Sequence, residues 1–227
     1  MEMSDYLEAG KRFLELKNYR SALEEFLLID EDPSDSPDLS YYLGICYTNL
    51  EKYDKALLYM EQVVTTHTDV LLVYQCRLIL SYIYSITGRY KLAEFELSEL
   101  VSVGFESAQI YGTYSYIAYS QQLVDKSIEY LRKAAELEPE NPNVLNSLGY
   151  ILANEEIDTE ESIVACKKAV RLKSEYPAYL DSLGWAYYKA GKTDEALVYL
   201  RKAFALAGTN KIIAGHLRVV IDHSKES

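Results

Sequence analysis

The chain has 227 residues, 49% of them hydrophobic and 26% charged, which is an ordinary globular composition with enough apolar residues for a sizeable core. Its formal net charge of −12 argues against nucleic acid or an anionic membrane as a partner, because both require a basic footprint. The three cysteines show neither a CxxC pair nor a Cys/His spacing, so we expect reduced, buried thiols and no zinc site.

The N-terminal stretch MEMSDYLEAG is polar, and no run of apolar residues approaches the length of a membrane span. As written, the chain is expected to be cytoplasmic and not to insert into a membrane. A periplasmic or envelope-associated location stays open if a signal peptide was removed. Acidic side chains outnumber basic ones most strongly in residues 1–70, which we interpret as a solvated surface.

Helical patterns follow one another along the whole chain, and we treat residues 1–227 as one domain. In chain order, pairs of helices are expected in 3–36, 37–70, 74–107, 108–141, 142–176 and 177–208. A further helix is expected in 209–225 because its apolar residues lie on one helical stripe. Since no second helix follows it, we interpret this segment as a cap for the sixth pair.

The pairs are copies of one motif. The stretch LGWAYYKAGKTDEALVYLRKA at 183–203 aligns with LGICYTNLEKYDKALLYMEQV at 43–63 and with AGKRFLELKNYRSALEEFLLI at 9–29. The eighth position of each unit is small, and it is occupied by Gly10, Gly44, Ser81, Ser115, Gly149 and Gly184. The twentieth position is small too, and it is occupied by Ala22, Ala56, Ala93, Ser127, Ser162 and Ala196.

These columns resemble the tetratricopeptide repeat, a unit of about 34 residues with the pattern W-x2-L-G-x2-Y, then A-x3-F, then P. The resemblance, closest to bacterial members of that family, implies an all-α fold. It implies a right-handed α-solenoid of about six helix-turn-helix units with a C-terminal capping helix. It also implies a non-catalytic protein-interaction scaffold, whose concave surface is lined by the first helix of each unit.

On those first helices, positions 2, 5, 9 and 12 form one stripe because their spacing follows the helical period. Position 9 becomes aromatic from the third unit onward, and amide and acidic side chains stand around it. We predict that this stripe is a groove for a peptide or a helix of another protein, because amides pair with a peptide backbone while rings cover its side chains. The predicted partner-binding residues are Tyr41, Tyr82, Tyr116, Tyr119, Asn143, Asn146, Tyr150, Asn154, Asp181, Trp185 and Tyr188.

Two alternatives remain open at this point. The aromatic rings of the stripe could pack on the next helix and contribute only to stability. The protein could also be a structural assembly protein that self-associates, or an accessory subunit of a bacterial envelope complex.

The sequence offers little for catalysis or for a metal. His67, His216 and His223 are dispersed, and no catalytic motif or phosphate-binding glycine loop occurs. We therefore predict no enzyme activity, no cofactor and no metal site, and we expect His216 and His223 to lie on the surface. The acidic run DEDPSDSPD at 30–38 lacks the glycine that a calcium loop needs, so we interpret it as a turn between units.

Overall fold

The structure is a computed structural model that describes residues 3–226. The chain divides into two compact units, Met1–Glu106 and Ser107–Ser227. Unit 1 contains α1 (Met3–Glu15), α2 (Tyr19–Phe26), α3 (Pro37–Asn49), α4 (Tyr53–Thr66), α5 (Val70–Ile86) and α6 (Tyr90–Ser102). Unit 2 contains α7 (Ala108–Ser120), α8 (Val124–Leu137), α9 (Pro142–Asn154), α10 (Thr159–Leu172), α11 (Pro177–Lys189), α12 (Thr193–Ala207) and α13 (Lys211–Glu226).

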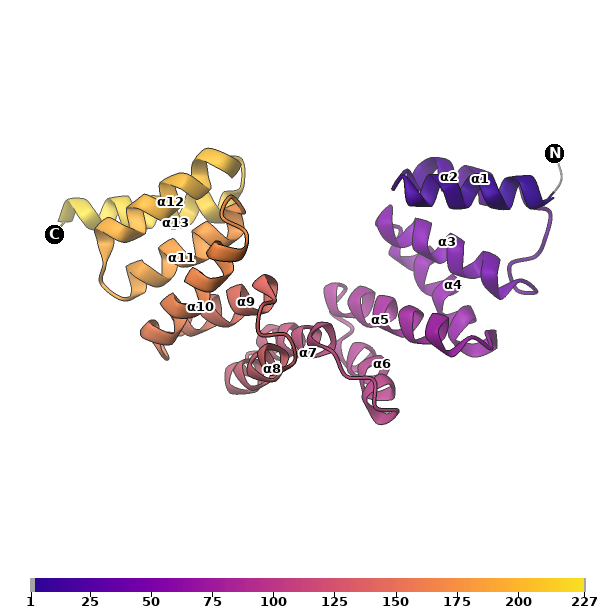
Figure 1. Cartoon of the computed structure of the whole chain (residues 1–227), viewed down its shortest axis with the longest axis horizontal. Coiled ribbons are helices and arrows are strands. Elements are labelled where there is room, and N and C mark those ends of the chain that lie inside the picture. Colours follow the sequence, from indigo (N-terminus) through magenta and orange to yellow (C-terminus); the bar gives the residue numbers. More distant parts are fainter. Residues whose placement is uncertain (1–2, 227) are drawn as a thin grey trace. The chain divides into compact units, whose positions relative to one another are not determined.

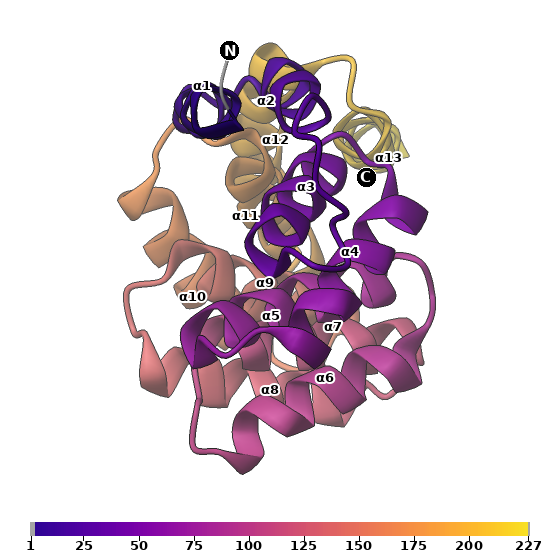
Figure 2. The same ribbon diagram turned by 90° about the vertical axis from the view of Figure 1, so that its right-hand side faces the viewer.

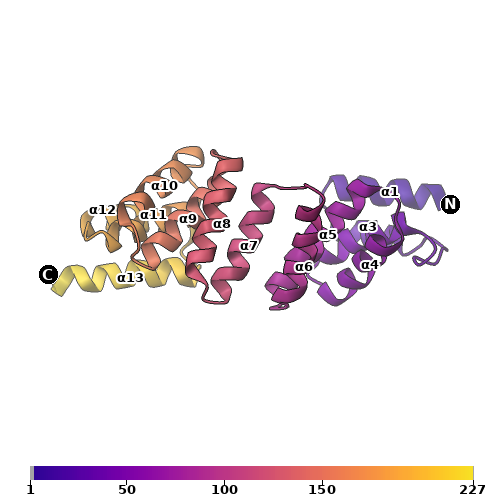
Figure 3. The same ribbon diagram turned by 90° about the horizontal axis from the view of Figure 1, so that it is seen from below.

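The predicted all-α repeat fold is confirmed, since the described residues form thirteen helices and no strand. Six antiparallel pairs are followed by the single helix α13 (Figure 1). Figure 2 shows the three pairs of unit 1 one after another, and Figure 3 shows α7 and α8 side by side in unit 2. The third pair begins earlier than expected, at Val70 rather than at residue 74. The carboxylate of Asp69 accepts hydrogen bonds from the amides of Leu71 and Leu72 and thereby fixes this earlier start.

The small columns bring the two helices of each pair into close contact. All six residues of the twentieth position are completely buried. A Cβ on Gly149 would clash with Cys166 Sγ and would lie 2.9 Å from the carbonyl oxygen of Ser162. Where serine replaces alanine, its hydroxyl is satisfied: Ser162 donates to the carbonyl of Gly149 at 2.7 Å. The repeat therefore sets the helix spacing with small residues on both helices.

The turn between the two helices is closed in the same way in all six pairs. One residue adopts a positive φ, and the amide of the following residue donates back to a carbonyl in the last turn of the first helix, as in a Schellman motif. Only two of the six are glycine; the set is Lys17, Glu51, Gly88, Gln122, Glu156 and Gly191. The fifth pair has a four-residue turn between α9 and α10, whereas the turns of the other five pairs have three residues.

The last helix, α13, lies beside α12 and α11. Ile213, Leu217 and Val220 are buried, and they join the apolar clusters formed by α11 and α12. Arg218 stands at the position that is small in the other units, and its side chain is 86% exposed. These contacts confirm that α13 covers the end of the sixth pair.

Candidate functional site

The predicted partner-binding residues fall on the first helices of their pairs, in both units. Unit 1 contributes Tyr41 on α3 and Tyr82 on α5. The hydroxyl of Tyr41 donates to Gln75 Oε1 at 2.8 Å, and burial raises the pKa of this phenol. Tyr82 is 48% exposed. The other nine residues lie in unit 2, where side-chain contacts bring most of them together.

A hydrogen-bonded chain crosses three first helices of unit 2. The hydroxyl of Tyr119 on α7 donates to Glu155 Oε1 at 2.7 Å. The amide nitrogen of Asn154 donates to Tyr119 Oη and to Glu155 Oε1, both at 3.0 Å. On the other side, Asn154 Oδ1 accepts from Trp185 Nε1 at 3.3 Å. Burial, and then the bond to Glu155, raise the pKa of Tyr119 to about 12, so this phenol is a hydrogen-bond donor at neutral pH.

Trp185 stands at the centre of an aromatic cluster that includes α13. Its indole stacks on the His216 imidazole with ring centroids 4.2 Å apart and an interplanar angle of 18°. The Tyr188 ring lies 5.2 Å away, and Lys189 Nζ lies 5.4 Å from the indole centroid. Tyr188 in turn meets His223 edge to face at 5.5 Å. The packing alternative thus has direct support at Trp185 and Tyr188, which lie against the core cluster of α11 and α12.

The expectation that both C-terminal histidines lie on the surface is wrong for His216. Its side chain is only 14% exposed, and its Nδ1 lies 2.8 Å from Asp181 Oδ2. Asp181 is itself buried, so the predicted stripe contains a buried carboxylate with a histidine partner. His223 is exposed, as expected. The physical reason is that α13 presents His216 toward α11 while its apolar residues enter the core.

The remaining stripe residues differ in exposure. Tyr116 is 49% exposed. Tyr150 is half-buried, with its ring centroid 6.3 Å from that of His216. Burial, and then the negative charges of Asp181 and Glu155, raise the pKa of Tyr150. Asn143 is exposed and accepts a hydrogen bond from the hydroxyl of Tyr179.

Two acceptor oxygens in this region have no hydrogen-bond partner. They are Asn146 Oδ1 on α9 and Asp181 Oδ1 on α11, and among the described residues they are the only buried side-chain polar atoms of this kind. Both occupy position 5 of their units, and α9 packs directly against α11. A buried acceptor without a donor costs about 1–3 kcal/mol. This pair is therefore the most unusual polar feature of the stripe.

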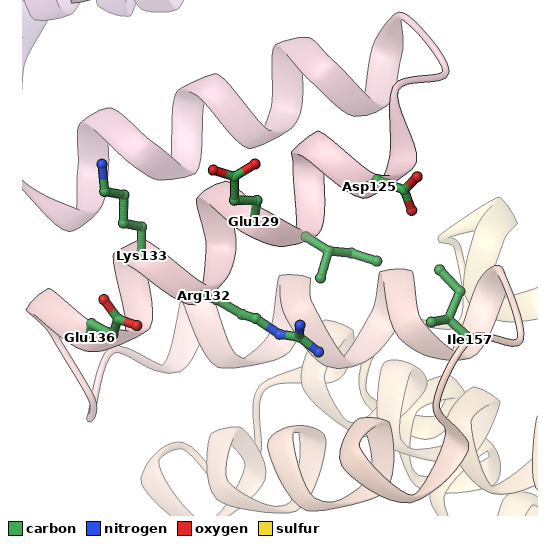
Figure 4. A pocket seen from close by; sticks show the side chains of 7 residues that line it. Asp125, Glu129, Arg132, Lys133, Glu136 and Ile157 are labelled. Atoms are coloured by element: carbon green, nitrogen blue, oxygen red, sulfur yellow. The ribbon is translucent and has the colours of Figure 1, made fainter.

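A separate hollow of about 430 Å³ lies on α8 and the turn before α10. Figure 4 shows Asp125 and Ile157 at one end of it and Lys133 and Glu136 at the other. Arg132 pairs with Glu161 at 2.8 Å, and Lys133 Nζ lies 4.7 Å from the centroid of the Tyr111 ring. None of the predicted stripe residues lines this hollow.

The described residues contain no group of three or more histidine, cysteine or acidic side chains placed to hold a metal ion. The three cysteines are buried, as expected, and burial raises the pKa of each thiol to about 12. Within residues 3–226, no helix combines the length and the apolar character that crossing a bilayer requires.

Comparison with known proteins gives the family. Models of the tetratricopeptide repeat match residues 7–69, 108–141 and 177–210, which together make up more than half of the chain. The chain belongs to the tetratricopeptide repeat family. Folds of this family are generally non-catalytic scaffolds that bind other proteins, and this tetratricopeptide repeat protein is consistent with that role.

Individual relatives are distant. The human protein O-mannosyl-transferase TMTC1 is 26% identical over 113 residues, which is 50% of this chain but 12% of that protein. YrrB, described as a TPR protein with an unusual peptide-binding site, is 15% identical, with a TM-score of 0.58 over 92% of this chain and 98% of its own. A tetratricopeptide repeat protein from Parabacteroides merdae is 12% identical, with a TM-score of 0.73 over 96% and 84%. At these identities, the two structures establish likeness of fold alone.

The residues that sequence reasoning missed are His216, Glu155 and Lys189. A usable signal exists, because contacts between neighbouring first helices recur at nearly one repeat period. Tyr41 and Gln75 are 34 residues apart, Tyr119 and Asn154 are 35, and Asp181 and His216 are also 35. Aligning polar side chains across successive units, α13 included, would have paired Asp181 with His216.

Proposed function

We propose that this protein binds a short segment of another protein on the first helices of unit 2. We call this surface the A-helix face and define it by Tyr116, Tyr119, Tyr150, Asn154, Trp185 and Tyr188. The observation that carries the proposal is the continuous chain of rings and amides from α7 across α9 to α11. Such a surface offers apolar area together with hydrogen-bond donors and acceptors, as peptide-binding grooves do.

The roles within the A-helix face differ. Tyr116 is 49% exposed and therefore open to a partner. Trp185 and Tyr188 contact α13 and each other, so they shape the floor of the face, with only part of each ring accessible. The amide group of Asn154 is hydrogen-bonded to Tyr119, Glu155 and Trp185, and it therefore holds the neighbouring rings in place. The peptide-binding site that names YrrB supports the same type of ligand for this fold.

The test is selection of short peptides from a displayed random library by the purified full chain. Selected peptides are then titrated against wild type while the fluorescence of Trp185, the single tryptophan, is recorded. Tyr116→Ala is expected to weaken binding about tenfold or more, since aromatic rings dominate such interfaces.

The matched control is Phe204→Ala on α12, which removes a ring that is 41% exposed from a second helix. This variant should bind as wild type does. Failure to select any peptide, or equal losses from Tyr116→Ala and Phe204→Ala, would contradict the proposal.

A further inference from the structure

The two unpartnered oxygens point to a specific chemistry of the bound segment. The Asp181 side chain is 7% exposed; its Oδ2 meets His216, while its Oδ1 has no donor. Asn146 Oδ1, one repeat earlier, is also buried and without a donor. Two neighbouring first helices thus each carry a buried acceptor oxygen without a donor, and the acceptor on α11 belongs to a carboxylate. A ligand that brings hydrogen-bond donors would recover the free energy lost by burying them.

Acidic side chains outnumber lysine and arginine beside the A-helix face: Glu155, Glu156 and Asp181 are acidic, and Lys189 is basic. Glu155 accepts from the hydroxyl of Tyr119 and the amide of Asn154, and neither of these groups carries a charge. The adjacent Glu156 pairs with Lys189 at 2.6 Å, so this lysine is already engaged. The negative charges of Asp181 and Glu155 both raise the pKa of the Tyr150 phenol, so this ring lies in the field of two carboxylates.

The rings of the face favour the same kind of ligand. Lys189 Nζ already lies 5.4 Å from the centroid of the Trp185 ring, so a cation is held against an aromatic surface of this face. An arginine combines donors with a flat guanidinium that stacks on rings, whereas a lysine offers a point charge.

We propose that the A-helix face selects protein segments that carry an arginine, or less favourably a lysine, seated beside Tyr150 and directed at Asp181 and Asn146. This inference rests on the proposed function, because it names the chemistry of the peptide bound there. Both oxygens are closed to solvent, so entry of the guanidinium requires a covering side chain to move, and His216, which contacts Asp181 Oδ2, is the side chain that we expect to move. His216 is the partner that a guanidinium would replace or join at Asp181.

The experiment uses peptides selected by the full chain as described above. The expected result is enrichment of arginine among them, and replacement of that arginine by glutamine should weaken binding about tenfold to a hundredfold, the range for a charge-assisted hydrogen bond. Replacement by glutamate should weaken it further. Selection of peptides without basic residues, or equal binding of the arginine and glutamine versions, would overturn this inference and leave peptide binding intact.

Variants of the protein assign the effect to Asp181. Asp181→Asn keeps the shape and removes the charge, so it should lose most of the preference for arginine over glutamine. The control Asp194→Asn makes the same charge change at an exposed position of α12 and should keep the preference. Asn146→Asp adds a second carboxylate on the neighbouring first helix and should strengthen the preference. Circular dichroism verifies that each variant is folded, and a folded Asp181→Asn protein with unchanged preference would refute the assignment.

Discussion

Replacing Trp185 with alanine tests whether its ring stabilises unit 2 or serves only to bind a partner. The indole stacks on His216 at 4.2 Å, donates to Asn154 at 3.3 Å and lies 5.2 Å from Tyr188. Truncation of a fully buried tryptophan costs about 3–5 kcal/mol. Because Trp185 is half-buried, we expect the free energy of unfolding to fall by about 2–3 kcal/mol.

The measurement is urea unfolding followed by far-ultraviolet circular dichroism, since the variant lacks the only tryptophan. Tyr116→Ala is the matched control in the same unit. Its ring is 49% exposed, so its truncation should cost less than about 1 kcal/mol. If Trp185→Ala proved as stable as wild type while binding was lost, the stack on His216 would contribute nothing to stability. The ring would then act only in binding the partner.

Three further predictions concern packing, turns and thiols. Gly149→Ala should lower the free energy of unfolding by about 1–3 kcal/mol because its Cβ would meet Cys166 and the Ser162 carbonyl. The control Gly112→Ala on α7 has open space around it and should raise the free energy of unfolding by up to about 1 kcal/mol. Similar effects of the two variants in urea unfolding would contradict the close-packing argument. Gln122→Gly should raise the free energy of unfolding by about 0.5–1 kcal/mol because the positive φ of this position suits glycine. A thermal unfolding midpoint equal to or below that of wild type would contradict this. The buried thiols, with their pKa raised to about 12, should react slowly with a disulfide reagent at about pH 8 in the folded protein and rapidly in urea. Unfolded thiols release protons near pH 8.5 and folded ones do not, so the thiol contribution to stability should be complete below about pH 8.5 and fall between there and about pH 12; urea midpoints that rise over this interval would refute it.

The helices could be predicted from the sequence because each repeat repeats its own local signals. Pro37, Pro142 and Pro177 each begin a first helix, and the small columns recur in every unit. The turns inside the pairs carry a weaker sequence signal. Glycine occupies the positive-φ position in two of them, but the other four have Lys17, Glu51, Gln122 and Glu156 there, residue types that do not indicate a positive φ. There the geometry of the repeat overrides the preference of the residue.

The candidate site was predicted less completely, for a reason visible at His216. Its helix could be identified as a cap from its apolar stripe, and that stripe does enter the core. The same stripe says nothing about which polar residue at its edge will lie over α11. Whether a histidine there reaches Asp181 depends on the rotation of α13 about its axis, and that rotation is set by how Ile213, Leu217 and Val220 pack.

The contacts at one repeat period explain why the stripe has to be considered as a whole. Trp185 is placed by Asn154 from the preceding unit and by His216 from the following helix. A substitution in one helix pair therefore changes the orientation of a ring in the next pair. The effects on binding of two substitutions in contacting residues will not add. The double variant Asn154→Ala/Trp185→Ala should accordingly lose less binding than the sum of the two single variants, because removing Asn154 already releases the indole. Strict additivity, measured by titration of one selected peptide, would show that the two residues contact the partner independently.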